Sequence, residues 1–384
     1  MGPLHGMKVI ELAGIGPVPL AGMLLADLGA DVVRVDRLGD SGLGVALPRQ
    51  FEVNSRGRRS IALDLKQPAA VDAVLKLVAG ADVLLEGFRP GVAERLGLGP
   101  DACRAANPRL VYGRMTGFGQ TGPLASAAGH DLNYLALTGL LHAIGPAGGR
   151  PVPPLNLVGD YGGGALYLAF GVLAALFERQ RSGQGQVVDA AMVDGAASLG
   201  SIFWGLRGAG QWGEARGHNL LDGGAPFYAT YETACGGWFA VAALEPKFFV
   251  ELAQRIGLPE RFVKRQYDRR LWPEMRQALA AIFLGKTRDQ WSALLEGTDA
   301  CSVPVLSIDE APGHAHARDR GAFVEVDGLL QPAPAPRFSR SAVDTPRPAP
   351  RPGQHSRSVL GEAGFADAEI DRLLATGVAA EGRE

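Results

Sequence analysis

His130 and Asp160 are the two residues of this sequence whose types and surroundings could carry out acid–base chemistry. His130 follows a glycine in GHDLNY (residues 129–134), and Asp160 precedes a run of glycines in GDYGGG (residues 159–164). A histidine and a carboxylate are side chains that proteins use to move protons near neutral pH.

Each of the two residues also has a structural interpretation. A lone histidine after a glycine is more often a hydrogen-bonded structural residue, and an aspartate before a helix is most often its N-cap. Both motifs, however, lie at predicted loop-to-helix junctions. We expect a helix to begin directly after Asp160, so that the amides of residues 160–162 can stabilise a developing negative charge.

The elements that must position these residues alternate between strands and helices. Apolar strand-like segments are separated by amphipathic segments, the order that produces a parallel sheet covered on both faces. The strand-like segments are residues 7–12, 31–37, 60–66, 81–88 and 109–118. The first turn, AGIGPVP, lacks GxGxxG and has prolines where amides would meet a pyrophosphate, so NAD binding is disfavoured. The carboxyl ends of the strands remain the natural ligand site.

The length of 384 residues predicts two domains. After about residue 207 the alternation of strands and helices stops, and the residue pattern predicts a glycine-rich loop followed by a hairpin that turns at CGG. The predicted parts are a large domain (1–206), a linker with a small α+β domain (207–323), and a proline-rich return segment with a C-terminal helix that completes the large domain (324–384).

Composition argues against several classes of function. The net charge is −2 and charged residues are dispersed, so no basic stripe for nucleic acid is present. The three cysteines are far apart, and His314 and His316 lack a third ligand nearby, so we expect neither disulfides nor a metal site. The longest apolar run, residues 162–177, is shorter than the roughly 20 residues of a membrane span. We expect a cytoplasmic protein without a membrane partner.

Five stretches together resemble the family III CoA-transferases (CaiB/BaiF), and most closely their α-methylacyl-CoA racemase branch. These stretches are residues 11–37, 58–66, 82–100, 129–139 and 155–164. The resemblance implies an α/β fold with a Rossmann-like parallel-sheet large domain and a smaller α+β domain. It also implies a homodimer of interlocked rings and an acyl-CoA thioester substrate, with no separate cofactor.

The resemblance further implies catalytic roles. Asp160 would be catalytic throughout the family, whereas His130 would distinguish the racemase branch, an isomerase of branched-chain fatty acid and lipid metabolism. His130 would take the α-proton of an (S)-2-methylacyl-CoA and Asp160 would protonate the other face of the enolate, with roles exchanged for the R substrate. Glu245 matches a family glutamate thought to reach the active site, or simply complements a helix dipole. Asp131 either tunes His130 or caps the following helix.

CoA needs positive charge for its phosphates, and the resemblance places several candidates at strand ends, where arginines are otherwise often only solvated. The predicted CoA-binding residues are Ile15, Arg37, Leu63, Asp64, Leu65, Lys66, Arg89, Arg95, Gly129, Leu132, Asn133 and Tyr134. Arg58 and Arg59 could assist. The acyl tail could lie on Met115, Tyr134, Leu140 and Trp204, which are equally interpretable as core residues.

Two other functions stay open at this point. The first is a CoA-transferase in which Asp160 forms an acyl anhydride, although Gly16 stands where formyl-CoA-type relatives have a glutamine. The second is a CoA-thioester binding protein without turnover, which the intact GHD and GD motifs disfavour.

Overall fold

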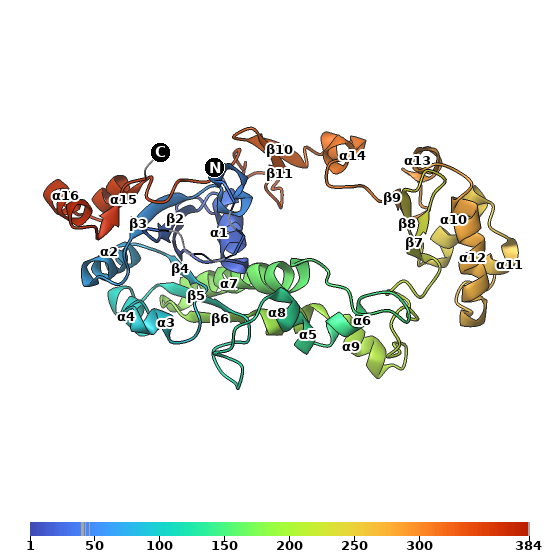
Figure 1. The fold of residues 1–384 in the computed structure, drawn as a ribbon, viewed down its shortest axis with the longest axis horizontal. Helices are drawn as coiled ribbons and strands as arrows, with labels where there is room; N and C mark the ends of the chain where they lie inside the picture. The colour runs from blue at the N-terminus through green and yellow to red at the C-terminus, as the bar shows by residue number, and fades with distance from the viewer. Residues whose placement is uncertain (40–41, 43, 46, 383–384) are drawn as a thin grey trace. The chain divides into compact units, whose positions relative to one another are not determined.

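The computed structural model describes residues 1–39, 42, 44–45 and 47–382, which group into two compact units (Figure 1). The first unit consists of Met1–Thr138, Leu155–Leu199 and Asp319–Glu384, and the second of Gly139–Pro154 and Gly200–Arg318. These bounds differ from the predicted ones chiefly at residues 139–154. Arg216 explains the difference, because its guanidinium donates to the carbonyls of His142 and Gly149 and so ties this loop to the second unit.

The first unit is built on a seven-stranded sheet with the order β12-β3-β2-β1-β4-β5-β6. Its strands are β1 (Lys8–Leu12), β2 (Asp31–Asp36), β3 (Arg59–Leu63), β4 (Val83–Glu86), β5 (Val111–Thr116), β6 (Val187–Ala191) and β12 (Ala379–Ala380). All neighbours pair in parallel except β12, which is antiparallel to β3. The predicted α/β fold with a parallel-sheet core is therefore confirmed, and the order of β1 to β6 is that of Rossmann folds.

Helices cover both faces of this sheet because its strands are apolar on both faces (Figure 1). In β1, Ile10 and Leu12 pack into one core and Val9 into the other. The first core also contains α2 (Pro68–Ala79), α4 (Pro100–Ala106), α15 (Ser356–Glu362) and α16 (Asp367–Ala375). The second contains α1 (Pro17–Asp27), α7 (Tyr167–Ser182) and the start of α8 (Met192–Leu199). Shorter helices are η1 (Arg49–Phe51), η2 (Val53–Ser55), α3 (Val92–Arg95) and α5 (Asp131–Leu137).

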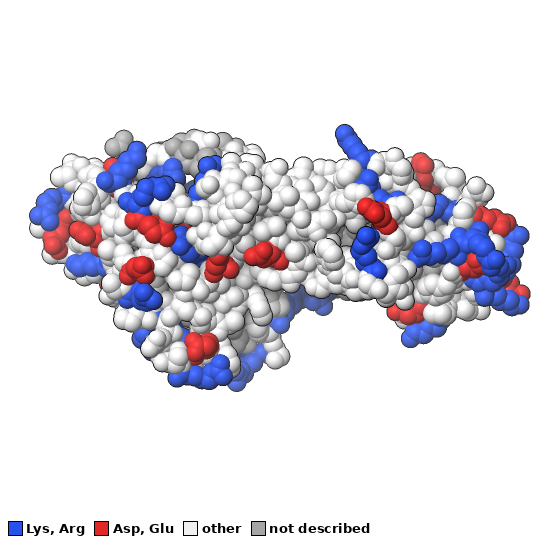
Figure 2. Space-filling view, turned by 90° about the horizontal axis from the view of Figure 1, so that it is seen from below, with Lys and Arg blue, Asp and Glu red and all other residues white. Residues whose placement is uncertain are grey.

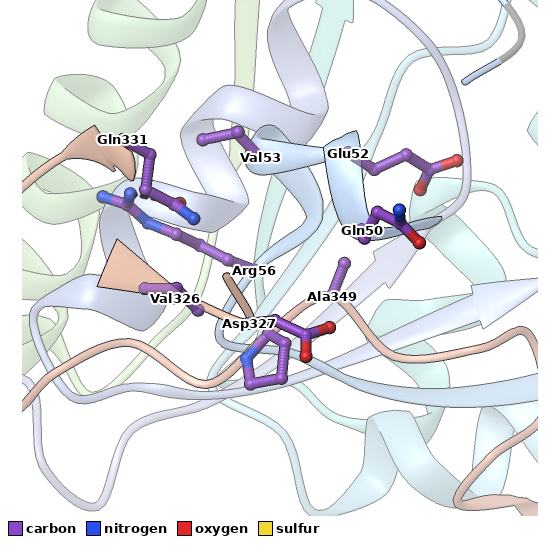
Figure 3. Close-up of a pocket in the computed structure, with 9 residues that line it drawn as sticks. Gln50, Glu52, Val53, Arg56, Val326, Asp327, Gln331 and Ala349 are labelled. Carbon is purple, nitrogen blue, oxygen red and sulfur yellow. Dashed lines mark hydrogen bonds between the residues drawn. The ribbon is translucent and has the colours of Figure 1, made fainter. Parts of the chain in front are cut away.

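The return segment is held on the first unit by a buried arginine. Its hairpin, β10 (Phe323–Val326) and β11 (Leu329–Pro332), was not predicted, because the flanking prolines mask so short a pattern. Arg56 donates to the side-chain oxygen of Gln331 at 2.8 Å and pairs with Asp27 of α1 at 2.6 Å. Figure 3 shows Arg56 pointing toward Gln331 at a small recess, whose lining includes neither His130 nor Asp160.

The second unit is an α+β structure with its own aromatic core. Its sheet has the order β7 (Tyr228–Glu232), β8 (Trp238–Ala242) and β9 (Ser302–Pro304), all antiparallel. Phe227, Phe239 and Phe283 are fully buried in the core beneath it. Its other elements are α6 (Leu140–Ala143), α9 (Ser201–Gly208), α10 (Pro246–Ile256), α11 (Glu260–Val263), η4 (Arg269–Leu271), α12 (Trp272–Phe283), α13 (Arg288–Leu295) and η5 (Ala311–Gly313); α14 (Ala315–Asp319) ends at the boundary between the units.

The helix that carries Asp160 is longer than predicted. A π-helical segment, η3 (Leu157–Leu166), continues directly into α7, so the helix runs over 26 residues and contains an 18-residue window with a mean hydropathy of 1.4. By length and composition alone it could cross a membrane, which corrects the expectation drawn from the shorter run. Leu168 and Val172 are buried against the sheet, as in a core helix.

Candidate active site

Three of the four predicted catalytic residues, His130, Asp131 and Asp160, lie together at the switch point of the sheet. β1 and β4 are neighbours from which the chain winds in opposite directions, and ligands of such sheets bind beyond the carboxyl ends of these strands. The turn after β1 ends at Gly16, the N-cap of α1, with φ of 73°. A Cβ atom at Gly16 would lie 3.7 Å from Oδ2 of Asp160. The Asp160 carboxylate therefore lies directly beside the start of α1.

Asp160 lies inside the π-helix η3, so the prediction that it precedes a helix is wrong. The glycines after it are required by packing rather than by a loop. A Cβ atom at Gly163 would collide with the backbone of Ala196 in α8, and one at Gly195 would collide with the carbonyl of Gly163. Close packing of η3 on α8 therefore explains the glycine run, and π-helical turns are frequent at functional sites.

Asp131 connects the two predicted proton carriers. It is the first residue of α5, and His130 is the N-cap, so Asp131 is not the helix cap. The backbone amide of His130 donates to Oδ1 of Asn133 at 3.0 Å. The Asp131 side chain is buried and its Oδ1 accepts the amide N–H of Asp160 at 2.7 Å. One carboxylate thus fixes the His130 turn to the Asp160 helix.

The amides expected to stabilise an enolate are already used. The Asp160 amide donates to Asp131, and the Tyr161 amide donates to the carbonyl of Asn156 at 3.3 Å. At the first turn of α5, by contrast, the amides of Asp131 and Leu132 donate to no acceptor within the part of the chain that the structure describes. The free amides closest in sequence to His130 are therefore at the start of α5, which corrects the prediction.

The environment of Asp160 shifts its proton affinity in the direction that acid–base catalysis needs. Burial raises the pKa of the Asp160 carboxyl, and the charge of Asp131 raises it further. The side-chain amide of Asn156, which donates to Oδ2 at 3.3 Å, and the charge of His130 lower this pKa. A raised pKa means that the carboxyl keeps its proton to a higher pH than an ordinary aspartate does, which favours a role as a general acid.

Asn156 escaped the sequence analysis. It stands four residues before Asp160, the spacing at which side chains meet on a helix. That signal was overlooked because the helix was expected to begin after Asp160.

Tyr134 stabilises the turn that contains His130. It is buried, its ring packs edge-on against Phe118 with centroids 4.9 Å apart, and its hydroxyl donates to the carbonyl of Gly129. Burial raises the pKa of Tyr134 to about 12; Asp160 raises it as well, and the charge of Arg89 lowers it. Tyr134 therefore belongs to the core, and Arg89 lies within electrostatic reach of the site.

The other residues proposed for the acyl tail divide between the units. Met115 is buried in the core of the first unit. Leu140 and Trp204 belong to the second unit, where Leu140 is buried and Trp204 is exposed.

The residues predicted to bind CoA lie mostly at the carboxyl edge of the sheet. Arg37 follows β2, Lys66 follows β3 and Arg89 follows β4, and all three are exposed. Since these strands are parallel, their ends meet at the edge where Asp160 lies. Ile15, in the turn after β1, is exposed as well.

Other predicted CoA residues have structural tasks. Leu63 is buried in the core, and the carboxylate of Asp64 accepts the Lys66 amide at 3.2 Å, which shapes the turn. Leu65 is partly buried against the same core, and Arg95 folds back toward Gly91 at the start of α3. Leu132 and Asn133 are exposed in the first turn of α5.

Arg58 and Arg59 are not free to assist with CoA. Arg58 is fully buried and pairs with Glu11 at 2.9 Å. Arg59 pairs with Asp31 at 2.6 Å and with Glu362 at 2.7 Å.

Glu245 belongs to the second unit. It is exposed at the N-cap of α10, and its side chain makes no capping hydrogen bond. His314 also lies in this unit and is partly buried, and its Nε2 lies 3.1 Å from Oε1 of Glu296.

Charged side chains of both signs are interspersed over the described surface shown in Figure 2.

Comparison with known proteins identifies the family. The model of CoA-transferase family III matches residues 4–356. Alpha-methylacyl-CoA racemase from Mus musculus is 48% identical over 373 residues, and that from Homo sapiens is 44% identical over 374 residues, each covering 96% of both chains. The crystal structure of a CAIB/BAIF family protein from Brucella suis has a TM-score of 0.79 at 26% identity, covering 94% of this chain and 99% of that one. The chain belongs to CoA-transferase family III.

Proposed function

We propose that this chain is an α-methylacyl-CoA racemase, an isomerase that interconverts (R)- and (S)-2-methylacyl-CoA by transfer of the α-proton through an enolate. The observation that carries the proposal is the link through Asp131, which follows His130 and accepts the amide of Asp160 at 2.7 Å. Through this link, His130 and Asp160, whose carboxyl has a raised pKa, are held at the same switch point of the sheet. The racemase relatives at 44% and 48% identity support the same function.

The two side chains divide the chemistry as follows. With the S substrate, neutral His130 removes the α-proton, and the electron pair of the C–H bond moves into the thioester carbonyl to form the enolate. Protonated Asp160 then delivers its proton to the opposite face of the α-carbon. With the R substrate, Asp160 removes the proton and protonated His130 delivers one, so the enzyme's total number of protons is unchanged.

The enolate oxygen needs donors placed where its charge develops. We propose the first-turn amides of Asp131 and Leu132 for this task, because they are free among the described residues and adjoin His130. Arg37, Lys66 and Arg89 would bind the phosphates of CoA, which enters as part of the substrate rather than as a separate cofactor. Glu245 keeps its proposed role as a further residue of the active site.

A second copy of the chain would complete the enzyme. Leu166, Phe170 and Phe177 are 53%, 72% and 66% exposed, and their spacing of four and seven residues puts them on one face of the helix. A row of exposed large apolar side chains marks an interaction surface. We propose that it lies in a homodimer, whose interlocked form the family resemblance implies, rather than in a membrane. On the sequence arguments we also propose a cytoplasmic enzyme without a nucleic-acid partner.

The dimer proposal is tested by sedimentation of the wild type and of the double variant Phe170→Glu/Phe177→Glu. We expect a wild-type dimer and a variant monomer. A wild type that is monomeric at micromolar concentration, or that binds phosphatidylcholine vesicles, would contradict the proposal.

A CoA-transferase remains the second candidate, because Asp160 could form an acyl anhydride. Gly16 argues against a transferase. The resemblance puts a glutamine at this position in formyl-CoA-type transferases, whereas the glycine at position 16 offers the Asp160 carboxylate no side chain.

Incubation of each 2-methylacyl-CoA enantiomer in heavy water, without acceptor acid, separates the candidates. A racemase incorporates deuterium and interconverts both enantiomers. A transferase instead moves CoA to an added acid and yields a hydroxamate at Asp160 with hydroxylamine. Tight binding without either reaction would indicate a binding protein.

A further inference from the structure

One hydrogen bond beside Asp160 has no part in the chemistry described so far. Asn54, in the short helix η2, donates from Nδ2 to the hydroxyl oxygen of Tyr161 at 2.9 Å. Tyr161 is the residue after Asp160 in the π-helix η3. Both side chains are half-buried. The bond therefore ties the turn of the helix that carries Asp160 to a separate part of the first unit.

The Asn54 end of this tie rests on a buried ion pair. Arg58 and Glu11 are both fully buried, and Nε of Arg58 lies 2.9 Å from Oε2 of Glu11. The guanidinium also donates to the carbonyl of Asn54 and to the carbonyl of Pro19 in the first turn of α1. One side chain thus fixes both the Asn54 turn and the start of α1.

A second arginine holds the same turn. Nη1 of Arg34 donates to the hydroxyl of Ser55 at 2.6 Å, and its Nε lies 2.9 Å from the carboxylate of Asp36. All of these groups are buried. This turn adjoins the recess of Figure 3, where Val53 is labelled. Because desolvation offsets much of the attraction within buried ion pairs, their clearest contribution here is a fixed position for residues 53–55.

The start of α1 bounds Asp160 from another side. A Cβ atom at Gly164 would lie 3.0 Å from Cβ of Pro17, and one at Gly16 would lie 3.7 Å from Oδ2 of Asp160. The same Arg58 that supports Asn54 supports this turn through Pro19. The helical turn that carries Asp160 and Tyr161 therefore contacts two segments, the start of α1 and the Asn54 turn, which are both held by Arg58.

We propose that Asn54 is a positioning residue for proton transfer at Asp160, acting through the hydroxyl of Tyr161. The proposal rests on the proposed function, because it gives Asn54 a role only if Asp160 moves a proton. A glycine-rich π-helical turn has weak internal constraints, and proton transfer is sensitive to displacements of about 1 Å. The hydrogen bond to Asn54 adds a constraint to those that α8 and Asp131 impose on this turn.

The variants Asn54→Ala and Tyr161→Phe each remove this one hydrogen bond. We expect kcat for interconversion of the two enantiomers, which requires Asp160 in both directions, to fall about fivefold, the rate equivalent of one ordinary hydrogen bond. KM should not change, because neither side chain is assigned to the substrate. The acid limb of the kcat profile should move to lower pH, because a looser turn lets water reach the carboxyl whose burial raises the pKa of Asp160. Asp131, His130 and Asn156, which also act on Asp160, remain in place.

Tyr167→Phe is the matched control. Tyr167 lies on the same continuous helix, and its hydroxyl donates to Oγ of Ser198 at 2.7 Å, so the variant removes an equivalent bond away from Asp160. We expect its kcat, KM and pH profile to equal those of the wild type. The double variant Asn54→Ala/Tyr161→Phe should have a kcat no lower than that of the less active single variant, because both substitutions remove the same hydrogen bond.

Two outcomes would overturn the proposal. In one, Asn54→Ala and Tyr161→Phe behave like Tyr167→Phe; in the other, their losses multiply in the double variant. If Asn54→Ala fails to fold, Tyr161→Phe alone decides by the same criteria. The variant Asp160→Asn distinguishes this inference from the proposed function. If Asp160→Asn still interconverts the enantiomers, the proposed function is refuted. If Asp160→Asn cannot interconvert them while Asn54→Ala is fully active, only the positioning role is refuted.

Discussion

Removing the carboxylate of Asp131 should affect stability and catalysis in different ways, depending on what replaces it. Asp131 is 6% exposed, and its Oδ1 is the acceptor of the Asp160 amide. Asp131→Ala leaves this buried amide without a partner, so we expect the free energy of unfolding to fall by about 1–3 kcal/mol. Asp131→Asn keeps an oxygen in the same place, and we expect a loss of about 1 kcal/mol or less, because only the charge is removed.

The pH profile tests the same contact independently of stability. The charge of Asp131 adds to burial in raising the pKa of Asp160. Both variants remove that charge, so the pKa of Asp160 should fall and the acid limb of kcat should move to lower pH in both. Only Asp131→Ala also releases the Asp160 amide, so its kcat should fall further, roughly tenfold for the loss of about 1.4 kcal/mol of positioning.

Urea denaturation and the rate of interconversion of the two enantiomers between pH 4 and 9 provide the two measurements. Equal stabilities of Asp131→Ala and Asp131→Asn would refute the hydrogen-bonding role. An acid limb that moves to higher pH, or does not move, would refute the electrostatic one.

Three further predictions concern the site and its supports. A carboxyl whose pKa is raised in the folded state binds its proton more tightly there than in the unfolded chain, so ionised Asp160 destabilises the fold above that pKa. Asp160→Asn should therefore raise the free energy of unfolding at pH 7. This gain should vanish near pH 4, where the aspartate is also protonated in the unfolded chain. Gly195→Ala would drive a methyl group into the carbonyl of Gly163, so it should lower both the melting temperature and kcat. Arg37→Ala should raise KM for the CoA thioester with little change in kcat, whereas the exposed Arg104→Ala on α4 should change neither; equal KM values for the two variants would remove Arg37 from the CoA site.

The strands were predictable from sequence, because a strand buried on both faces is a continuous apolar run. IAL in β3 and VLL in β4 are such runs, and both lie in the parallel sheet. The family prediction is also confirmed, because it rests on five separated stretches that the family model and the racemase relatives span.

The glycine run after Asp160 shows where local reasoning failed. Glycines in a single sequence indicate a loop or a helix start. Here Gly163 is required by the backbone of α8, more than 30 residues later in the chain. Because this contact is distant in sequence, local reasoning could not reveal that the glycine run packs within a helix that includes Asp160.

The arginines failed for a similar reason. Arg37 and Arg58 have comparable sequence surroundings, each at the end or start of a predicted strand. The structure leaves Arg37 exposed and buries Arg58 on Glu11, which is 47 residues away in sequence. Sequence does not reveal an ion-pair partner at that separation. The arginines could therefore be named as CoA candidates, but those that are free could not be distinguished from those that are paired.

The two-base mechanism is tested most directly by deuterium incorporation in the variants His130→Ala and Asp160→Asn, with each enantiomer supplied separately in heavy water. If the two side chains flank the α-carbon, Asp160→Asn should still exchange the α-proton of the S substrate through His130. His130→Ala should exchange only the R substrate, through Asp160. In both cases the configuration should be retained, because the opposite proton carrier is missing. Interconversion by either variant, or exchange of the same enantiomer by both, would contradict the assignment of one base to each face.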